Sequence, residues 1–263
     1  MKTFMMPAPP KAHERKMAEA LSEMVELMAR IFRNQVILEL KQSTVKQFED
    51  AKPETNYAAV YMKIANRITG KLIKRFDEKR LYNLNEQIIN AADRTNKSVL
   101  YNAFSRVAGL DPKQIIKEES GRALTDAIIE ETAQWALKLR DDALQSFTNR
   151  TLRAMSQGLS IDEIIKEFDG EIPKRKNHAK FLARTQIANY NALISKNRAQ
   201  NLGITEAVWV GHDDGRERES HIWRNGKRFK LSEGLYSPLD KKFLIPGVDY
   251  QCRCRARYIL PDE

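Results

Sequence analysis

The chain has 263 residues, a formal net charge of +10, 42% hydrophobic residues and 30% charged residues. This balance is typical of globular proteins and excludes the disordered and collagen-like classes. The chain has no run of 18 apolar residues and no signal-peptide pattern, so we expect no membrane-spanning helix. Two cysteines are too few for a disulfide-rich secreted domain, which favours folding in a reducing cytoplasm.

Along most of the first 200 residues, apolar side chains recur at spacings of three and four, which predicts amphipathic helices. Residues 1–12 contain three prolines and are interpreted as a flexible arm. Pro53 and Gly158 are expected to end two helices, and Ser160 with Glu163 forms a capping box at the start of another. We expect a helical body over residues 13–170, with its main helices at 13–49, 56–76, 83–108 and 125–157.

The pattern changes after Gly203, where the C-terminal module (residues 204–263) begins. Residues 207–210 are a short strand candidate, Asn225-Gly226 is typical of a tight hairpin turn, and residues 252–259 alternate as a strand does. The predicted fold class is therefore α+β: a mainly α-helical N-terminal body, with a small C-terminal α+β module that contains short antiparallel strands. The last predicted domain, residues 171–263, comprises a basic helix and this module.

The densest positive charge lies just before the predicted helix at residues 178–202, in a segment expected to be a connector. A cluster of this kind can neutralise phosphates and bind nucleic acid without reading its sequence. The alternative is a solvated surface whose charge only keeps the protein soluble. The candidate DNA contacts are Lys174, Arg175, Lys176 and Lys180, and a secondary candidate patch consists of Arg253, Arg255 and Arg257.

The two cysteines, Cys252 and Cys254, are separated by one residue. In an extended strand they point to the same side, and a disulfide between them would be strained, so we expect free thiols. Together with His221 and either His212 or Asp213 they would supply four ligands suitable for zinc. The alternative is a pair of buried structural cysteines that bind no metal.

The segment before His221 is rich in charged side chains. We interpret Asp213, Arg216, Arg218 and His221 as a hydrogen-bonded knot that orders a loop of low apolar content. Acid–base chemistry by His221 with Asp213 or Asp214 is the alternative, although the chain has no recognisable nucleophile or phosphate-loop motif. Trp209 lies between two valines, so we expect it in the core.

Four elements in residues 184–254 follow one another in a recognisable order. Together they resemble the minor head protein family of tailed phages, typified by protein F of phage Mu, over about residues 150–260. Gln186 departs from the family pattern, which often has Glu after Arg-Thr. The elements are Arg184-Thr185, Trp209, the run Asp213-x-x-Arg216-x-Arg218-x-x-His221 leading to Asn225-Gly226, and Pro246-Gly247 before Cys252-Arg253-Cys254.

The resemblance implies a virion assembly protein rather than an enzyme. Such a protein resides inside the head, after assembly in the host cytoplasm, and takes part in head morphogenesis and in DNA retention or ejection. The implied partners are the portal protein, phage DNA bound non-specifically, and other head and scaffolding proteins, with no membrane and no cofactor apart from the possible zinc. Two alternatives stay open: a metal-dependent phage hydrolase or nuclease that uses Asp213, Asp214 and His221, and a helical scaffold without a DNA role.

Overall fold

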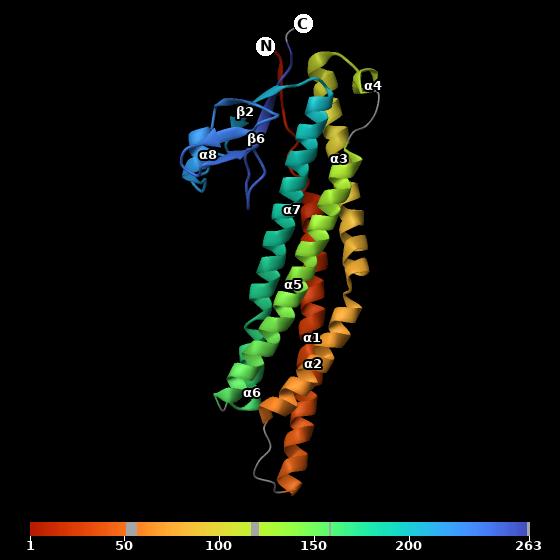
Figure 1. Ribbon diagram of the computed structural model, residues 1–263, viewed down its shortest axis with the longest axis vertical. Helices are drawn as coiled ribbons and strands as arrows, with labels where there is room; N and C mark the ends of the chain where they lie inside the picture. Colours follow the sequence, from red (N-terminus) through yellow and green to blue (C-terminus); the bar gives the residue numbers. More distant parts are fainter. Residues whose placement is uncertain (51–56, 117–120, 158, 262–263) are drawn as a thin grey trace. The chain divides into compact units, whose positions relative to one another are not determined.

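The computed structural model describes residues 1–50, 57–116, 121–157 and 159–261 (Figure 1). The expected helix breaks at Pro53 and Gly158 lie outside these residues. The fold class is confirmed as α+β. The helices are α1 (Lys11–Asp50), α2 (Tyr57–Arg75), α3 (Glu78–Ala108), α4 (Pro112–Ile115), α5 (Arg122–Ser156), α6 (Ile161–Asp169), α7 (Ile172–Asn201) and α8 (Glu219–Arg224). The strands are β1 (Thr3–Met5), β2 (Glu206–Val210), β3 (Arg228–Lys230), β4 (Leu235–Ser237), β5 (Lys242–Leu244) and β6 (Arg255–Ile259).

The capping box is confirmed at the start of α6. The backbone N–H of Ser160 donates to the Glu163 carboxylate over 2.8 Å, and the Ser160 hydroxyl accepts from the backbone N–H of Glu163. These two bonds satisfy amide groups that the first turn of a helix leaves without partners. Local chemistry is therefore sufficient to set the start of this helix.

The basic run is part of a helix, not the expected connector. Helix α7 begins at Ile172 and includes residues 174–176. Pro173 does not prevent this, because a proline in the first turn of a helix removes no intrahelical hydrogen bond.

The segment predicted as a flexible arm is ordered. Strand β1 pairs antiparallel with β6, with Thr3 opposite Ile259, and helix α1 already begins at Lys11. The side chains of Phe4 and Met6 are buried. The prolines gave a local signal for flexibility, but burial of these two side chains against a strand from the far end of the chain outweighs it.

The described chain forms two compact units, and several helices contribute to both. The predicted division at residues 12 and 170 therefore stays a prediction. In the helical unit, Phe32 stacks on Phe168 with ring centroids 5.8 Å apart, and Phe147 packs against both. The helical unit comprises Ala18–Asn83 and Ala133–Leu182, and the sheet-containing unit comprises Met1–Met17, Leu84–Thr132 and Ala183–Glu263.

The sheet-containing unit holds an antiparallel sheet in the order β1-β6-β2-β3 and a separate two-stranded hairpin of β4 and β5 (Figure 1). Its inner face packs on side chains from α3 and α7 of the same unit. Among the described residues, no helix is long and apolar enough to cross a bilayer. The shared core includes Leu100, Phe104, Ala199, Leu202, Ala207, Trp209, Phe229, Cys252, Cys254 and Tyr258.

Candidate functional site

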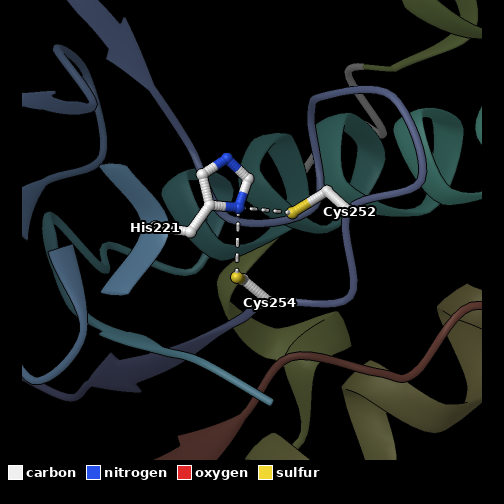
Figure 2. A group of neighbouring side chains, drawn as sticks. All are labelled: His221, Cys252 and Cys254. Atoms are coloured by element: carbon white, nitrogen blue, oxygen red, sulfur yellow. Dashed lines mark hydrogen bonds between the residues drawn. The ribbon is translucent and has the colours of Figure 1, made fainter. Parts of the chain in front are cut away.

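The structure brings together three residues that the sequence proposed as metal ligands. His221 comes from α8, and Cys252 and Cys254 come from the segment before β6. The His221 Nδ1 atom lies 3.6 Å from the Cys252 Sγ atom and 3.5 Å from the Cys254 Sγ atom (Figure 2). All three side chains are buried, and their ligand atoms lie within 4.8 Å of one another. We call this group the ligand trio.

The cysteines do not lie in a strand, because β6 begins at Arg255. A turn delivers them instead: the backbone N–H of Cys252 donates to the Asp249 carbonyl, and Gln251 has φ of +55°. The two cysteine side chains nevertheless point to the same side, as expected, because both sulfur atoms face the same imidazole nitrogen.

The expected fourth ligands do not join the trio. His212 and Asp213 are exposed, and neither belongs to the described cluster of ligand atoms. Glu217 is closer to that role, because its Oε1 atom lies 3.7 Å from the Cys254 Sγ atom. Gly211 makes room for this carboxylate: a Cβ atom at position 211 would lie 2.9 Å from the Glu217 Oε1 atom.

The outer nitrogen of His221 has a partner that the sequence analysis missed. The His221 Nε2 atom lies 3.2 Å from Asp249 Oδ2, and Arg218 forms an ion pair with the same oxygen at 3.1 Å. Arg218 also donates to the Tyr250 carbonyl, and the Tyr250 backbone N–H donates to Asp249. Asp249 lies 28 residues from His221 along the chain, in no motif that a sequence pattern could identify.

The ligand trio shifts the acid–base properties of its own members. A hydrogen bond with Cys252 raises the pKa of His221. A hydrogen bond from Cys254 lowers the pKa of the Cys252 thiol, and a hydrogen bond with His221 has a smaller effect in the same direction. The same sulfur–sulfur contact and burial raise the pKa of Cys254. The site therefore favours a thiolate at Cys252 beside an imidazole that holds a proton.

The sequence analysis named the wrong carboxylate for the hydrogen-bonded knot that it predicted from Asp213, Arg216, Arg218 and His221. Asp213 is exposed with φ of +52°, and Asp214 is the residue that binds Arg216 at 2.8 Å and Arg253 at 2.6 Å. The Arg253 guanidinium lowers the pKa of Asp214 far below its usual range. The charged residues thus divide into two groups, one around Asp214 and one around Asp249.

Trp209 contacts the ligand trio directly, and Asn225-Gly226 holds the backbone around Trp209 in place. Trp209 is fully buried, as expected, with its ring centroid 5.5 Å from that of His221. The backbone N–H of Gly226 donates to the Trp209 carbonyl, and the Asn225 side chain accepts from the backbone N–H of Gly211. Asn225-Gly226 ends α8 rather than joining two strands, because the positive φ of Gly226 suits a helix end as well as a hairpin.

Arg224 is a second central residue that sequence reasoning missed. It is completely buried, and all five of its N–H groups donate: two to the Asp240 carboxylate and one each to the carbonyls of Ser220, Leu235 and Lys242. These bonds join α8 to the β4–β5 hairpin. No sequence signal marks it, since arginine is usually exposed.

The four candidate DNA contacts on α7 are not gathered on one face. Lys174 and Arg175 form ion pairs with the buried Glu171 and line one surface depression with Arg150. Burial raises the pKa of Glu171, but hydrogen bonds from Lys174 and Ser146 and the nearby Arg150 outweigh it and bring the value to about 2.

The other two candidates on α7 face a different part of the surface. Lys176 pairs with Glu26, and Lys176 and Lys180 line a second depression. Both sets stay accessible in part, because Lys174 and Lys180 are exposed. Their contact with DNA stays a prediction.

In the secondary candidate patch, Arg253 and Arg255 contact other residues of the protein. Arg253 binds Asp214, and Arg255 donates to the Met6 carbonyl at 2.8 Å. Burial lowers the pKa of Arg255. Arg257 is exposed, so it alone of the three presents an accessible guanidinium.

The remaining motif residues lie on α7 or against it. Thr185 and Gln186 are buried, whereas Arg184 is half-buried. Gly247, from the Pro-Gly pair, has φ of +94°, and a Cβ atom there would lie 2.8 Å from the Ala192 Cβ atom. Glycine is therefore required for this segment to approach α7.

Residues 145–257 match the family model described as "Phage Mu protein F like protein". The chain is also 24% identical over 242 residues to an "Uncharacterized protein" of Haemophilus influenzae, covering 90% of this chain and 51% of that relative. The chain thus spans about half the length of the curated relative it matches. No solved structure matches the chain significantly.

The predicted resemblance is confirmed by the family match, which includes every motif residue from Arg184 to Cys254. The match shows that this part of the chain is similar to a family of phage proteins.

Proposed function

We propose that this protein, whose residues 145–257 match the phage Mu protein F-like family, is a minor head protein that associates with the portal and acts in head morphogenesis. In this role it lies inside the head beside packaged DNA, binds that DNA without sequence preference, and assists its retention or ejection. It assembles in the host cytoplasm and contacts other head and scaffolding proteins. The family match carries the proposal, because it includes the motif residues around which the C-terminal module is built.

The DNA part of the proposal rests on charge. The chain carries a net +10, and Lys174 and Lys180 expose their side chains on α7. Lysines of this kind contact phosphates and position a protein on DNA without reading bases. Because Glu171 and Glu26 offset part of the charge, we expect affinity in the weak, non-specific range.

The test replaces Lys174, Arg175, Lys176 and Lys180 by Ala and measures binding to a random-sequence duplex over a range of salt concentrations. The expected result is weaker binding and a shallower slope of log K against log salt, by about 0.9 for each phosphate that the variant no longer neutralises. A matched control removes the same charge from four exposed basic residues of the helical unit: Lys71, Lys74, Arg75 and Lys79.

The two variants distinguish local binding from an effect of net charge. If the α7 variant retains the wild-type slope, or if the control loses as much affinity as the α7 variant, the assignment of the DNA contacts is wrong. If the wild-type protein binds no duplex at low salt, the scaffold without a DNA role is correct.

Portal association is tested by co-expressing this chain with a portal protein from the same genome and purifying through a tag on the portal. We expect the chain to stay bound through a high-salt wash, which removes contacts that are only electrostatic. A tagged major capsid protein serves as the control. Retention on neither bait, with both proteins folded, would contradict a role in head assembly.

We propose no catalytic role. His221 pairs with Asp249 rather than with Asp213 or Asp214, and Asp214 is bound by two arginines. Among the described residues, the ligand trio is the one cluster of three or more potential metal ligands, whereas nucleases usually gather several carboxylates around their metals. Nicking of plasmid DNA with magnesium, manganese or zinc, abolished by Asp214→Asn, would overturn this.

A further inference from the structure

We propose that His221, Cys252 and Cys254 bind one structural zinc ion, with the Glu217 carboxylate as the fourth ligand. The site goes beyond the proposed head-protein function and does not depend on it. Thiolate and imidazole are the ligands that zinc prefers in structural sites, and this donor set is too soft for magnesium or calcium.

The distances fit a zinc ion. Zinc binds cysteine sulfur at about 2.3 Å and histidine nitrogen at about 2.0–2.1 Å, so a tetrahedral site separates these two atoms by about 3.6 Å. The His221 Nδ1 atom lies 3.6 Å from Cys252 Sγ and 3.5 Å from Cys254 Sγ. Both nitrogen–sulfur distances therefore already match edges of a zinc tetrahedron (Figure 2).

The surroundings of His221 favour metal binding through Nδ1. A ligating histidine commonly donates its other N–H to a carboxylate, which fixes the ring and its tautomer. Here the Nε2 atom faces Asp249 at 3.2 Å, and Arg218 holds the same carboxylate at 3.1 Å. With the proton at Nε2, the lone pair of Nδ1 points between the two sulfur atoms.

Glu217 lies next to Cys254 of the trio. Its Oε1 atom is 3.7 Å from Cys254 Sγ, and the absence of a side chain at Gly211 leaves room for it. The carboxylate is outside the cluster of mutually close ligand atoms, so it moves inward when the ion binds. Zinc with two thiolates and one carboxylate carries a net charge of −1.

The buried environment also needs a cation. Two buried sulfurs lie beside the Glu217 carboxylate, and burial of a thiolate without a paired charge is costly. The indole N–H of Trp209 has no oxygen or nitrogen partner among the described residues. A metal would stabilise both thiolates at once and give this N–H a charged sulfur to face.

Such an ion would join α8 to the start of β6 across a sequence separation of 31 residues. The strands of the C-terminal module have three to five residues, and small units with little core commonly gain stability from a metal.

The first experiment uses the wild-type chain, expressed with zinc and purified without chelator. We expect about one zinc per chain by elemental analysis. Because the chain has only two cysteines, thiol alkylation reports on the site alone: both thiols should resist alkylation until a chelator is added. Cobalt substitution should give a thiolate charge-transfer band and the intense visible bands of a tetrahedral ion.

Variants then identify the ligands. Cys252→Ser, Cys254→Ser and His221→Asn should each lose the bound zinc, while His212→Asn and Asp213→Asn, which change the exposed alternatives, should retain it. Asp249→Asn should weaken zinc binding about 10–100-fold. Glu217→Gln should keep the thiolate charge-transfer band of the cobalt protein but alter its visible bands.

The outcomes distinguish this site from its alternatives, even if a ligand variant fails to fold. Wild-type protein that is folded, metal-free and unchanged in melting temperature by chelator or added zinc would overturn the proposal. An intramolecular disulfide found by mass spectrometry, or iron in place of zinc, would also overturn it. None of these results would affect portal or DNA binding, so failure of the zinc site is distinguishable from failure of the proposed function.

Discussion

The helical unit and the C-terminal module differ in the contacts at their centres. In the helical unit, the aromatic rings of Phe32, Phe147 and Phe168 pack against one another, and most ion pairs lie at least partly in solvent. In the C-terminal module, Arg224 and His221 are buried at the centre with polar partners. Long helices can bury apolar stripes, whereas short strands and turns depend on specific polar contacts to join them.

The largest expected effect is that of Arg224→Ala in the C-terminal module. It would leave Asp240 and the carbonyls of Ser220, Leu235 and Lys242 without their donor, at a cost of about 3–5 kcal/mol in the free energy of unfolding. The matched control is Arg228→Ala, whose partner Glu206 is at the surface and whose loss should cost at most about 1 kcal/mol. Urea denaturation measures both, and equal losses would contradict the contrast.

A pair of carboxylate replacements makes the same comparison between the two regions. Asp240→Asn leaves the fully buried Arg224 charge poorly compensated, for an expected loss of about 2–3 kcal/mol. Glu171→Gln in the helical unit frees Lys174 and Arg150, which solvent can reach, so we expect about 1 kcal/mol. A larger loss for Glu171→Gln, measured in the same urea series, would reverse the comparison.

Acid should weaken the helical unit through Glu171. Its pKa is lowered from 4.5 to about 2, so its stabilising contribution is complete above pH 4.5 and is lost as the pH falls towards 2. Solvent screening at the exposed Lys174 reduces this contribution to about 1–2 kcal/mol. Unfolding measured from pH 6 to pH 2.5 should therefore show a smaller pH dependence for Glu171→Gln than for wild type. Identical pH curves for the two proteins would contradict the assignment of this acid sensitivity to Glu171.

The smallest expected effect concerns the cap of α6. Ser160→Ala removes the side chain that accepts from the N–H of Glu163 and should cost about 1 kcal/mol. Ser156→Ala, which removes a bond to the Arg153 carbonyl at the exposed end of α5, is the control and should cost less. Thermal melting of the two variants measures the difference, which vanishes if α6 is held by its packing alone.

The helices were largely predictable because their signals are local. The apolar spacing, the capping box and the turn glycines all act within a few residues, and the observed helices follow them. The exceptions are residues 174–176, where charge and a nearby proline suggested a connector, and the short helix α8, which the sequence analysis did not predict. Pro173 occupies the first turn of α7, where proline is tolerated.

The centre of the C-terminal module was only partly predictable. The order of Trp209, His221 and the two cysteines indicated the family resemblance and the trio, because these residue types carry recognisable chemistry. Arg224, Asp249 and β1 were missed, since each depends on partners far along the chain. Asn225-Gly226 was misinterpreted because a helix end and a hairpin require the same backbone geometry.

We expect the buried polar contacts of Arg224 to stabilise the C-terminal module. Hydrogen exchange of Arg224→Ala, followed peptide by peptide against wild type, is the sharpest test of this statement. We expect faster exchange across β2, β6 and the β4–β5 hairpin, with no change in the part of α5 around Phe147. Exchange that is unchanged in the module, or that rises equally in both units, would show that other contacts stabilise it.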